Sequence, residues 1–199
     1  MSHIQHLSKD KVLAKIIDKK NPVSLSTEKN IYLQVCYSIM SQQLSTKVAA
    51  IIHERFLELY DKKKPSLEKI AATPFARLKS IGLSDSKTNY VLNVCDYFIE
   101  HKLTDAKLHK MTDEEVIETL TSIKGVGQWT AEMVLMFAMG RENVFSADDL
   151  GIQQQMCSLY SIDNTSKKLM KMEMEKIAAN WSPYITYACR YLWNWKDGN

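Results

Sequence analysis

The chain has 199 residues, of which 45% are hydrophobic and 25% are charged, and its formal net charge is +3. These values are typical of a globular protein and exclude a disordered or fibrous chain. Six glycines and four prolines are few for this length, which disfavours a β-meander and favours helices. The small basic excess is compatible with a nucleic-acid partner but does not by itself indicate one.

The four cysteines, at positions 36, 95, 157 and 189, include no C-x-x-C pair. This spacing excludes a zinc ribbon and a clustered iron–sulfur motif, and it favours reduced core thiols in a cytosolic protein. The first 20 residues lack the apolar segment of a signal peptide, and no apolar run approaches the ~20 residues of a membrane span. We therefore expect a soluble, cytoplasmic protein with no membrane partner.

Apolar residues between Gln34 and Leu59 recur at three- to five-residue steps, which predicts a long helix broken near 42–45. Pro22 and 61–66 are the expected loops. Further helices follow from capping residues and apolar stripes. They are 75–80 after Thr73-Pro74, a helix capped by Ser84, a helix with the capping-box pair Thr112 and Glu115, the nearly all-apolar 129–139, a helix from Thr165 or Ser166 to Ala179, and 181–195. With no alternating strand pattern, we predict an all-α fold.

Two glycines, Gly125 and Gly127, lie in the run KGVGQWTA between two predicted helices. A tight turn there can point backbone N–H groups outward beside a helix N-terminus, which suits a phosphate. The alternative is a plain helix–helix turn. The surrounding pattern resembles the helix–hairpin–helix motif, which grips a nucleic-acid backbone without reading its sequence. The matching residues are Leu120, Ile123, Gly125, Val126, Gly127, Thr130 and Ala131. Residues 81–83, followed by Lys87, resemble the same motif more weakly.

A pair of carboxylates, Asp148 and Asp149, follows in the run FSADDLGI. Either could be a helix N-cap, or one could lie at the mouth of an apolar pocket. Together with the hairpin, this run resembles the HhH-GPD superfamily of base-excision DNA glycosylases, in which a Gly/Pro-containing loop precedes an essential Asp. Asp149 is the matching residue. The loop has Gly140, and Ser146 stands where many relatives have a proline.

Within that superfamily, the chain most resembles the alkylation-repair branch, the DNA-3-methyladenine glycosylase II type. Three features carry this likeness: the segment MSQQLST at 40–46, Trp129 directly after Gly-Val-Gly-Gln, and a W-x-P…YA…W pattern over 181–193. The resemblance covers roughly 31–195. It implies two helical lobes with DNA in the cleft between them. The whole chain, 1–199, would be one glycosylase unit.

The resemblance also implies the extent of each lobe and a role for several residues. About 31–145 would form the central lobe with the hairpin, and about 1–30 plus 146–199 the second lobe. Asp149 would stabilise the sugar cation and orient the attacking water. Leu44 would fill the gap left by the flipped nucleotide, with Gln43 beside the orphaned base; alternatively, Leu44 only continues an apolar stripe.

The hairpin would hold one DNA phosphate through Lys124, Gly125, Val126, Gly127 and Thr130. In the family, hairpin carbonyls often hold a structural Na⁺ or K⁺. The matching carbonyls are those of Thr121, Ile123 and Val126. No iron–sulfur cluster or other required cofactor is expected.

The base pocket would contain Trp129, Met133, Leu150 and Trp193, where the two indoles would face a cationic base; each Trp could instead be ordinary core. Bifunctional relatives have a lysine at the position of Trp129. Because an indole cannot form an imine, a monofunctional hydrolase is expected.

The expected function is hydrolysis of the N-glycosidic bond of alkylated purines in damaged double-stranded DNA, chiefly 3-methyladenine and secondarily 7-methylguanine, as the first step of base excision repair. Two alternatives are a glycosylase of the same superfamily for uracil, mismatched or oxidised bases, and a non-enzymatic helix–hairpin–helix DNA-binding module. A monomer in the nucleoid or nucleus would suffice. The five histidines show no ligand spacing and are expected at the surface, without a catalytic metal.

Overall fold

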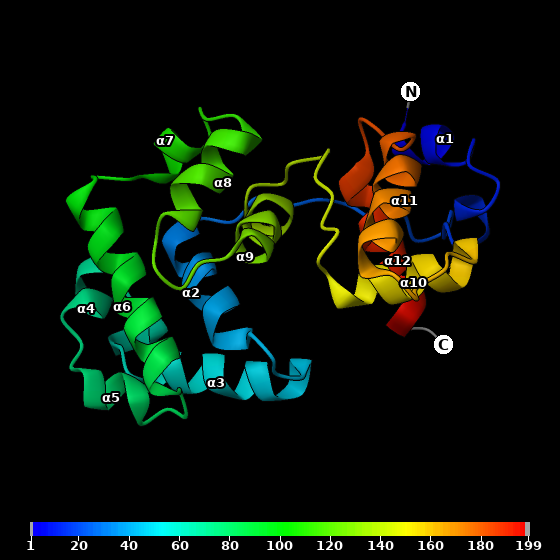
Figure 1. Ribbon diagram of the computed structural model, residues 1–199. Helices are drawn as coiled ribbons and strands as arrows, with labels where there is room; N and C mark the ends of the chain where they lie inside the picture. The colour runs from blue at the N-terminus through cyan, green and yellow to red at the C-terminus, as the bar shows by residue number, and fades with distance from the viewer. Residues whose placement is uncertain (1, 198–199) are drawn as a thin grey trace. The chain divides into compact units, whose positions relative to one another are not determined.

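The computed structural model describes residues 2–197, and every regular element in that range is a helix (Figure 1). The fold is therefore all-α, as predicted. The chain divides into a central unit, Thr27–Met139, and a terminal unit that combines the residues up to Ser26 with those from Gly140 onward. The family resemblance implies boundaries near 30 and 145. Met1 and residues 198–199 of the expected 1–199 unit lie outside the described residues.

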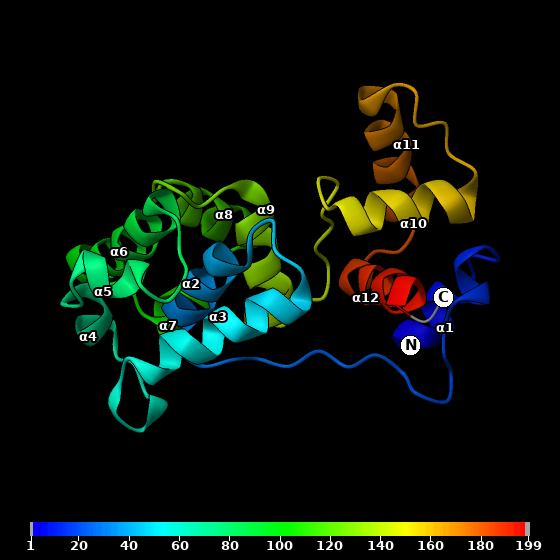
Figure 2. The ribbon, with the colours of Figure 1, turned by 90° about the horizontal axis from the view of Figure 1, so that it is seen from below.

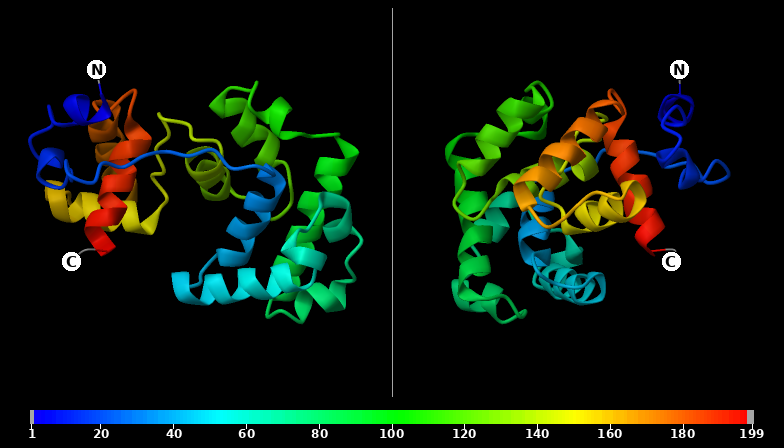
Figure 3. Two further views of the ribbon diagram at one scale, coloured as in Figure 1. Left: turned by 180° about the vertical axis from the view of Figure 1, so that it is seen from behind. Right: turned by 45° about the vertical axis from the view of Figure 1, so that its right-hand side comes forward.

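The central unit is built around α2 and α6, which pack against each other, with α4 and α5 against α6 and with α3, α9 and η3 against α2 (Figures 1 and 3). Apolar side chains of both central helices are fully buried, among them Val35 and Ile39 of α2 and Val91 of α6. The elements are α2 (Ile31–Ser41), α3 (Thr46–Glu58), η2 (Asp61–Lys63), α4 (Leu67–Ala71), α5 (Phe75–Lys79), α6 (Asp85–Glu100), α7 (Asp105–Leu108), α8 (Asp113–Thr121), α9 (Gln128–Met133) and the π-helical turn η3 (Val134–Ala138).

The predicted caps are largely confirmed. Ser84 accepts a hydrogen bond from a backbone N–H in the first turn of α6, and Thr112 and Glu115 form the capping box of α8. The helix expected over 75–80 is α5, and Pro74 is its N-cap. The nearly all-apolar helix expected over 129–139 continues after Met133 as η3. Most of its side chains are buried, and Phe137 is 41% exposed.

The terminal unit contains α1 (His3–Leu7), η1 (Leu13–Lys15), α10 (Leu150–Tyr160), α11 (Lys167–Ala179) and α12 (Ile185–Asp197). Its two chain segments lie side by side in Figures 1 and 2, where the blue N-terminal segment runs next to the red α12. The carboxylate of Asp10 joins them, because it accepts hydrogen bonds from Tyr160 Oη (2.7 Å) and Trp181 Nε1 (3.0 Å). The helix expected from 181 starts only at Ile185.

All four cysteines are free; three are buried, but Cys157 is half-exposed, contrary to the expectation of four core thiols. Among the described residues, no helix has the length and apolar composition that crossing a membrane requires.

Candidate active site and nucleic-acid interface

Asp149 is the N-cap of α10, and its side chain is held at two points. Its Oδ1 accepts hydrogen bonds from the backbone N–H of Ile152 (2.8 Å) and from the indole Nε1–H of Trp193 (2.9 Å). Both donors restrict the orientation of the carboxylate. The capping and catalytic interpretations of Asp149 therefore do not exclude each other.

Gly151 allows Trp193 to reach this carboxylate. A Cβ atom at Gly151 would lie 3.1 Å from both Asp149 Oδ1 and Trp193 Cδ1, which is closer than ordinary packing tolerates. Sequence reasoning gave Gly151 no role, although a glycine two residues after a candidate catalytic Asp was a signal for such a close approach. Leu150, between them, is 66% exposed.

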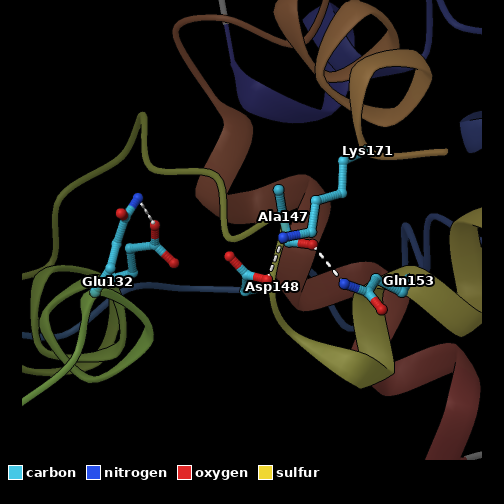
Figure 4. Close-up of polar contacts among 6 residues, drawn as sticks. Glu132, Ala147, Asp148, Gln153 and Lys171 are labelled. Atoms are coloured by element: carbon cyan, nitrogen blue, oxygen red, sulfur yellow. Dashed lines mark hydrogen bonds and ion pairs between the residues drawn. The ribbon is translucent and has the colours of Figure 1, made fainter. Parts of the chain in front are cut away.

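Asp148 has a different environment from Asp149. Its carboxylate pairs with the ammonium of Lys171 from α11, while Gln153 Nε2 donates to the carbonyl of Ala147 at 2.7 Å (Figure 4). These contacts fix the segment before α10 from two sides. Asp148 therefore does not cap the helix and belongs to the surface beside Asp149.

The helix–hairpin–helix pattern folds as α8, the hairpin turn Ser122–Gly127, and α9, which continues into η3. Gly125 has a φ of +105°, and a Cβ atom there would lie 2.1 Å from Cγ of Tyr90. The turn therefore requires glycine at this position. At Gly127 a Cβ atom would meet nothing within 4 Å, so the protein itself imposes no such requirement there.

The other hairpin residues with an expected role differ in exposure. Lys124 is exposed, and its carbonyl accepts a hydrogen bond from Asn93 (3.0 Å). Val126 is buried, so only its backbone can reach a ligand. Thr130 is also buried, and its hydroxyl accepts a hydrogen bond from Gln42 Nε2 (3.3 Å). The side chain of Thr130 therefore connects α9 to the loop after α2.

The loop Gln42–Ser45, which we call the wedge loop, separates α2 from α3. The predicted break in the long helix is thus confirmed at its expected position. Gln43 has a φ of +58°, and both it and Leu44 are exposed, the latter by 37%. Leu44 therefore lies in a tight turn between two helices and does not continue a helical stripe.

A cavity of about 540 Å³ lies in the central unit, between α2, α3, α9 and η3, and its lining is mainly apolar. Trp129 and Met133 line it, together with residues that sequence reasoning did not select. These are Gln34, Tyr37, Ser38, Ser41, His53, Val134, Phe137 and Ala138. A mostly apolar cavity with a few polar groups is typical of a site for a small ligand. Leu150 and Trp193 belong to the terminal unit, so the lining of this cavity does not include them.

The polar side of the cavity is organised around His53. Its Nε2 lies 3.0 Å from Ser41 Oγ and 3.2 Å from the carbonyl of Tyr37, and its ring lies against that of Tyr37 at a centroid distance of 4.5 Å. Because Ser41 Oγ donates its own proton to the Tyr37 carbonyl (2.8 Å), His53 Nε2 is assigned as the donor. His53 is half-buried in this cavity, so its expected surface position is wrong. The same burial lowers the pKa of the ring.

His3 was also expected at the surface, but its ring stacks on Tyr187 at 4.2 Å. Among the described residues, no three His, Cys, Asp or Glu side chains gather in a way that could hold a metal ion.

Comparison with known proteins identifies a family. Residues 36–180 match the family described as the HhH-GPD superfamily base excision DNA repair protein. DNA-3-methyladenine glycosylase 1 of Schizosaccharomyces pombe is 30% identical over 194 residues, which cover 96% of this chain and 84% of that protein.

Two solved structures are similar along nearly the whole chain. One is the Schizosaccharomyces pombe 3-methyladenine DNA glycosylase in complex with abasic DNA, with a TM-score of 0.85, 31% identity, and coverage of 97% of this chain and 95% of that one. The other is a DNA-3-methyladenine glycosidase from Bacillus halodurans, with a TM-score of 0.80, 33% identity, and coverage of 98% and 88%.

Proposed function

Because the chain belongs to the HhH-GPD superfamily of base excision DNA repair proteins, we propose that it is a monofunctional DNA glycosylase for alkylated purines. Its substrate is 3-methyladenine in duplex DNA, with 7-methylguanine as a second substrate, and its product is an abasic site. The similar proteins named as 3-methyladenine DNA glycosylases support this substrate class. The two hydrogen bonds that orient the Asp149 carboxylate support the chemistry most directly.

Asp149 acts on the sugar side of the bond that breaks. As the N-glycosidic bond lengthens, positive charge develops on the sugar, and a preoriented carboxylate stabilises it without having to reorganise. The same carboxylate orients the water that attacks the sugar and accepts its proton. An alkylated base already carries positive charge and leaves readily, so a second catalytic carboxylate is unnecessary.

The hairpin turn binds the DNA backbone near the lesion. No protein atom covers the position of a Cβ at Gly127, so a DNA phosphate can approach the backbone there. The backbone N–H groups at the start of α9 suit one phosphate, and Lys124 adds positive charge beside them. The carbonyls of Thr121, Ile123 and Val126 would hold an alkali cation. Ile123 O accepts one backbone hydrogen bond, from Val126 N (3.0 Å), and a carbonyl has a second lone pair for a cation.

Leu44 and Gln43 replace the extruded nucleotide in the base stack. Extrusion costs a few kcal/mol, and the exposed, apolar Leu44 side chain compensates part of that cost by stacking in the gap. Gln43 lies beside it and faces the orphaned partner base with a side chain that can both donate and accept hydrogen bonds.

The extruded base is recognised by its electron deficiency. Trp129 contributes an aromatic face to the cavity of the central unit, and Met133 adds an adaptable apolar surface. Trp193, beside Asp149, offers a second aromatic ring for a cationic base. Leu150 is an exposed apolar side chain directly beside Asp149. An indole at position 129 offers no amine for a Schiff base, so the DNA strand is left uncut.

One experiment tests the function as a whole. Methylated duplex DNA is incubated with the full chain, released bases are identified by chromatography, and the DNA is run on a denaturing gel without alkali. We expect free 3-methyladenine and intact strands. Retained DNA binding without base release would contradict the enzymatic function, and direct strand cleavage would contradict its monofunctional character.

A further inference from the structure

Lys87, in the first turn of α6, reaches a different helix. Its Nζ donates hydrogen bonds to the carbonyl of Met40 (3.0 Å) and to the carbonyl of Gln42 (2.6 Å). Met40 belongs to the last turn of α2, and Gln42 begins the wedge loop. The ammonium group is thus shared between the end of the helix and the start of the loop, and its side chain is half-buried.

The end of α2 requires such a donor. The last carbonyls of a helix have no partner within the helix and carry the negative end of its dipole. Here the backbone turns abruptly, because Gln43 has a φ of +58° two residues after Ser41. The Lys87 ammonium binds one carbonyl of the last helical turn, that of Met40, and the carbonyl of the C-cap Gln42, so it stabilises the chain at the point where it leaves the helix.

A second contact holds the same loop from another side. The side chain of Gln42 donates to the hydroxyl of Thr130 in α9, at 3.3 Å. The wedge loop is therefore fastened to α6 through Lys87 and to the hairpin through Thr130. Lys87 and Thr130 are both far from the loop in sequence. Leu44 follows the fastened residues Met40 and Gln42 and is 37% exposed.

We propose that Lys87 is a positioning residue that stiffens the wedge loop, so that Leu44 can displace a nucleotide from the duplex. This inference rests on the proposed function, in which Leu44 is the inserted side chain. A loose loop would lose order on insertion and would hold the flipped state less well, and small misplacements of positioned groups can slow a reaction on the order of 100-fold. Lys87 acts here through backbone carbonyls rather than through a DNA phosphate.

The test uses Lys87→Met, which keeps most of the side-chain stem and removes the donors, and Lys87→Arg, which keeps a cation and its donors. Lys79→Met is the matched control, because Lys79 is exposed and its ammonium pairs with the exposed Asp85 (2.7 Å). Two measurements are made on the full chain: hydrogen–deuterium exchange of a peptide that covers 38–48 in the free protein, and the single-turnover rate of 3-methyladenine release.

In Lys87→Met we expect faster exchange in that peptide, base release slower by about 10- to 100-fold, and an unchanged dependence of DNA affinity on salt. If Lys87 instead contacted a DNA phosphate, its removal would reduce the salt dependence of DNA affinity by about one ion. Lys87→Arg should recover at least part of the rate, and Lys79→Met should behave as the wild type. Leu44→Ala combined with Lys87→Met should be no slower than Leu44→Ala alone.

Several results would overturn the inference. They are unchanged exchange or unchanged base release in Lys87→Met, a reduced salt dependence, or rate losses that simply add in the double variant. A Leu44→Ala variant with the wild-type rate would refute the wedge and this inference together, while leaving the glycosylase activity intact. Absence of base release by the wild type would instead refute the proposed function, and the exchange measurement alone would then decide whether Lys87 holds the loop.

Discussion

The indole Nε1–H of Trp193, in α12, donates a hydrogen bond to Oδ1 of Asp149, at 2.9 Å. The two residues lie 44 positions apart in the chain. This contact gives Trp193 a function beyond an aromatic surface, because it fixes the orientation of the carboxylate that we propose as catalytic. The narrow space beside Gly151 is a consequence of the same contact.

Trp193→Phe should slow base release by about 10- to 100-fold. The substitution keeps an aromatic ring but removes the N–H, and a hydrogen bond to a charged group contributes about 1.5–3 kcal/mol. Single-turnover rates measure the effect. Trp195→Phe, two residues later in the same helix, is the matched control and should keep the wild-type rate; equal losses in both variants would contradict a specific role for Trp193.

The two hairpin glycines should respond differently to replacement by alanine. Gly125→Ala should lower the free energy of unfolding by more than about 1 kcal/mol, because the residue has a positive φ and its Cβ would overlap Tyr90. Gly127→Ala should leave folding unchanged and weaken DNA binding, since its added methyl group meets only the approaching DNA. Thermal unfolding and DNA affinity separate the two. A Gly127→Ala variant with full affinity would argue against a phosphate at this turn.

Stability should fall as the pH drops below about 6.5, the usual value of an unfolded histidine. Burial lowers the pKa of both His53 and His3, so the unfolded chain takes up protons at a pH where the folded protein does not. The loss continues until the pH passes below the folded pKa values. His53→Gln should flatten the decline in Tm between pH 7 and pH 5, and an unchanged decline would mean that His53 does not contribute to it.

The protein should form no covalent adduct with DNA that contains an abasic site when borohydride is present. Trapping requires an imine between a protein amine and the sugar, and Trp129 stands where bifunctional relatives have a lysine. A stable protein–DNA band on a denaturing gel would show that another amine performs lyase chemistry.

The sequence was most informative where a feature is local. The polar run after Met40 indicated the break between α2 and α3, and the spacing of Thr112 and Glu115 indicated a capping box; both depend only on neighbouring residues. The start of α12 was misplaced because Ser182-Pro183 is typical of a helix opening, whereas residues 181–183 form a turn before Ile185.

The features that the sequence did not reveal depend on distant contacts. His53 and Tyr37 meet across α3 and α2, and Lys87 reaches the end of α2 from α6. No spacing rule connects such residues, because their proximity follows from the packing of whole helices. The same reasoning explains why a histidine without ligand spacing was expected at the surface and is instead half-buried in a cavity.

Asp149→Asn tests the central claim most directly. Asparagine is as good an N-cap as aspartate, and its Oδ1 can still accept from Ile152 and Trp193, so folding should be preserved. Release of 3-methyladenine from methylated duplex DNA is measured together with DNA affinity. We predict that base release is abolished while DNA binding is retained; release at the wild-type rate would contradict the assignment of Asp149 as the catalytic carboxylate.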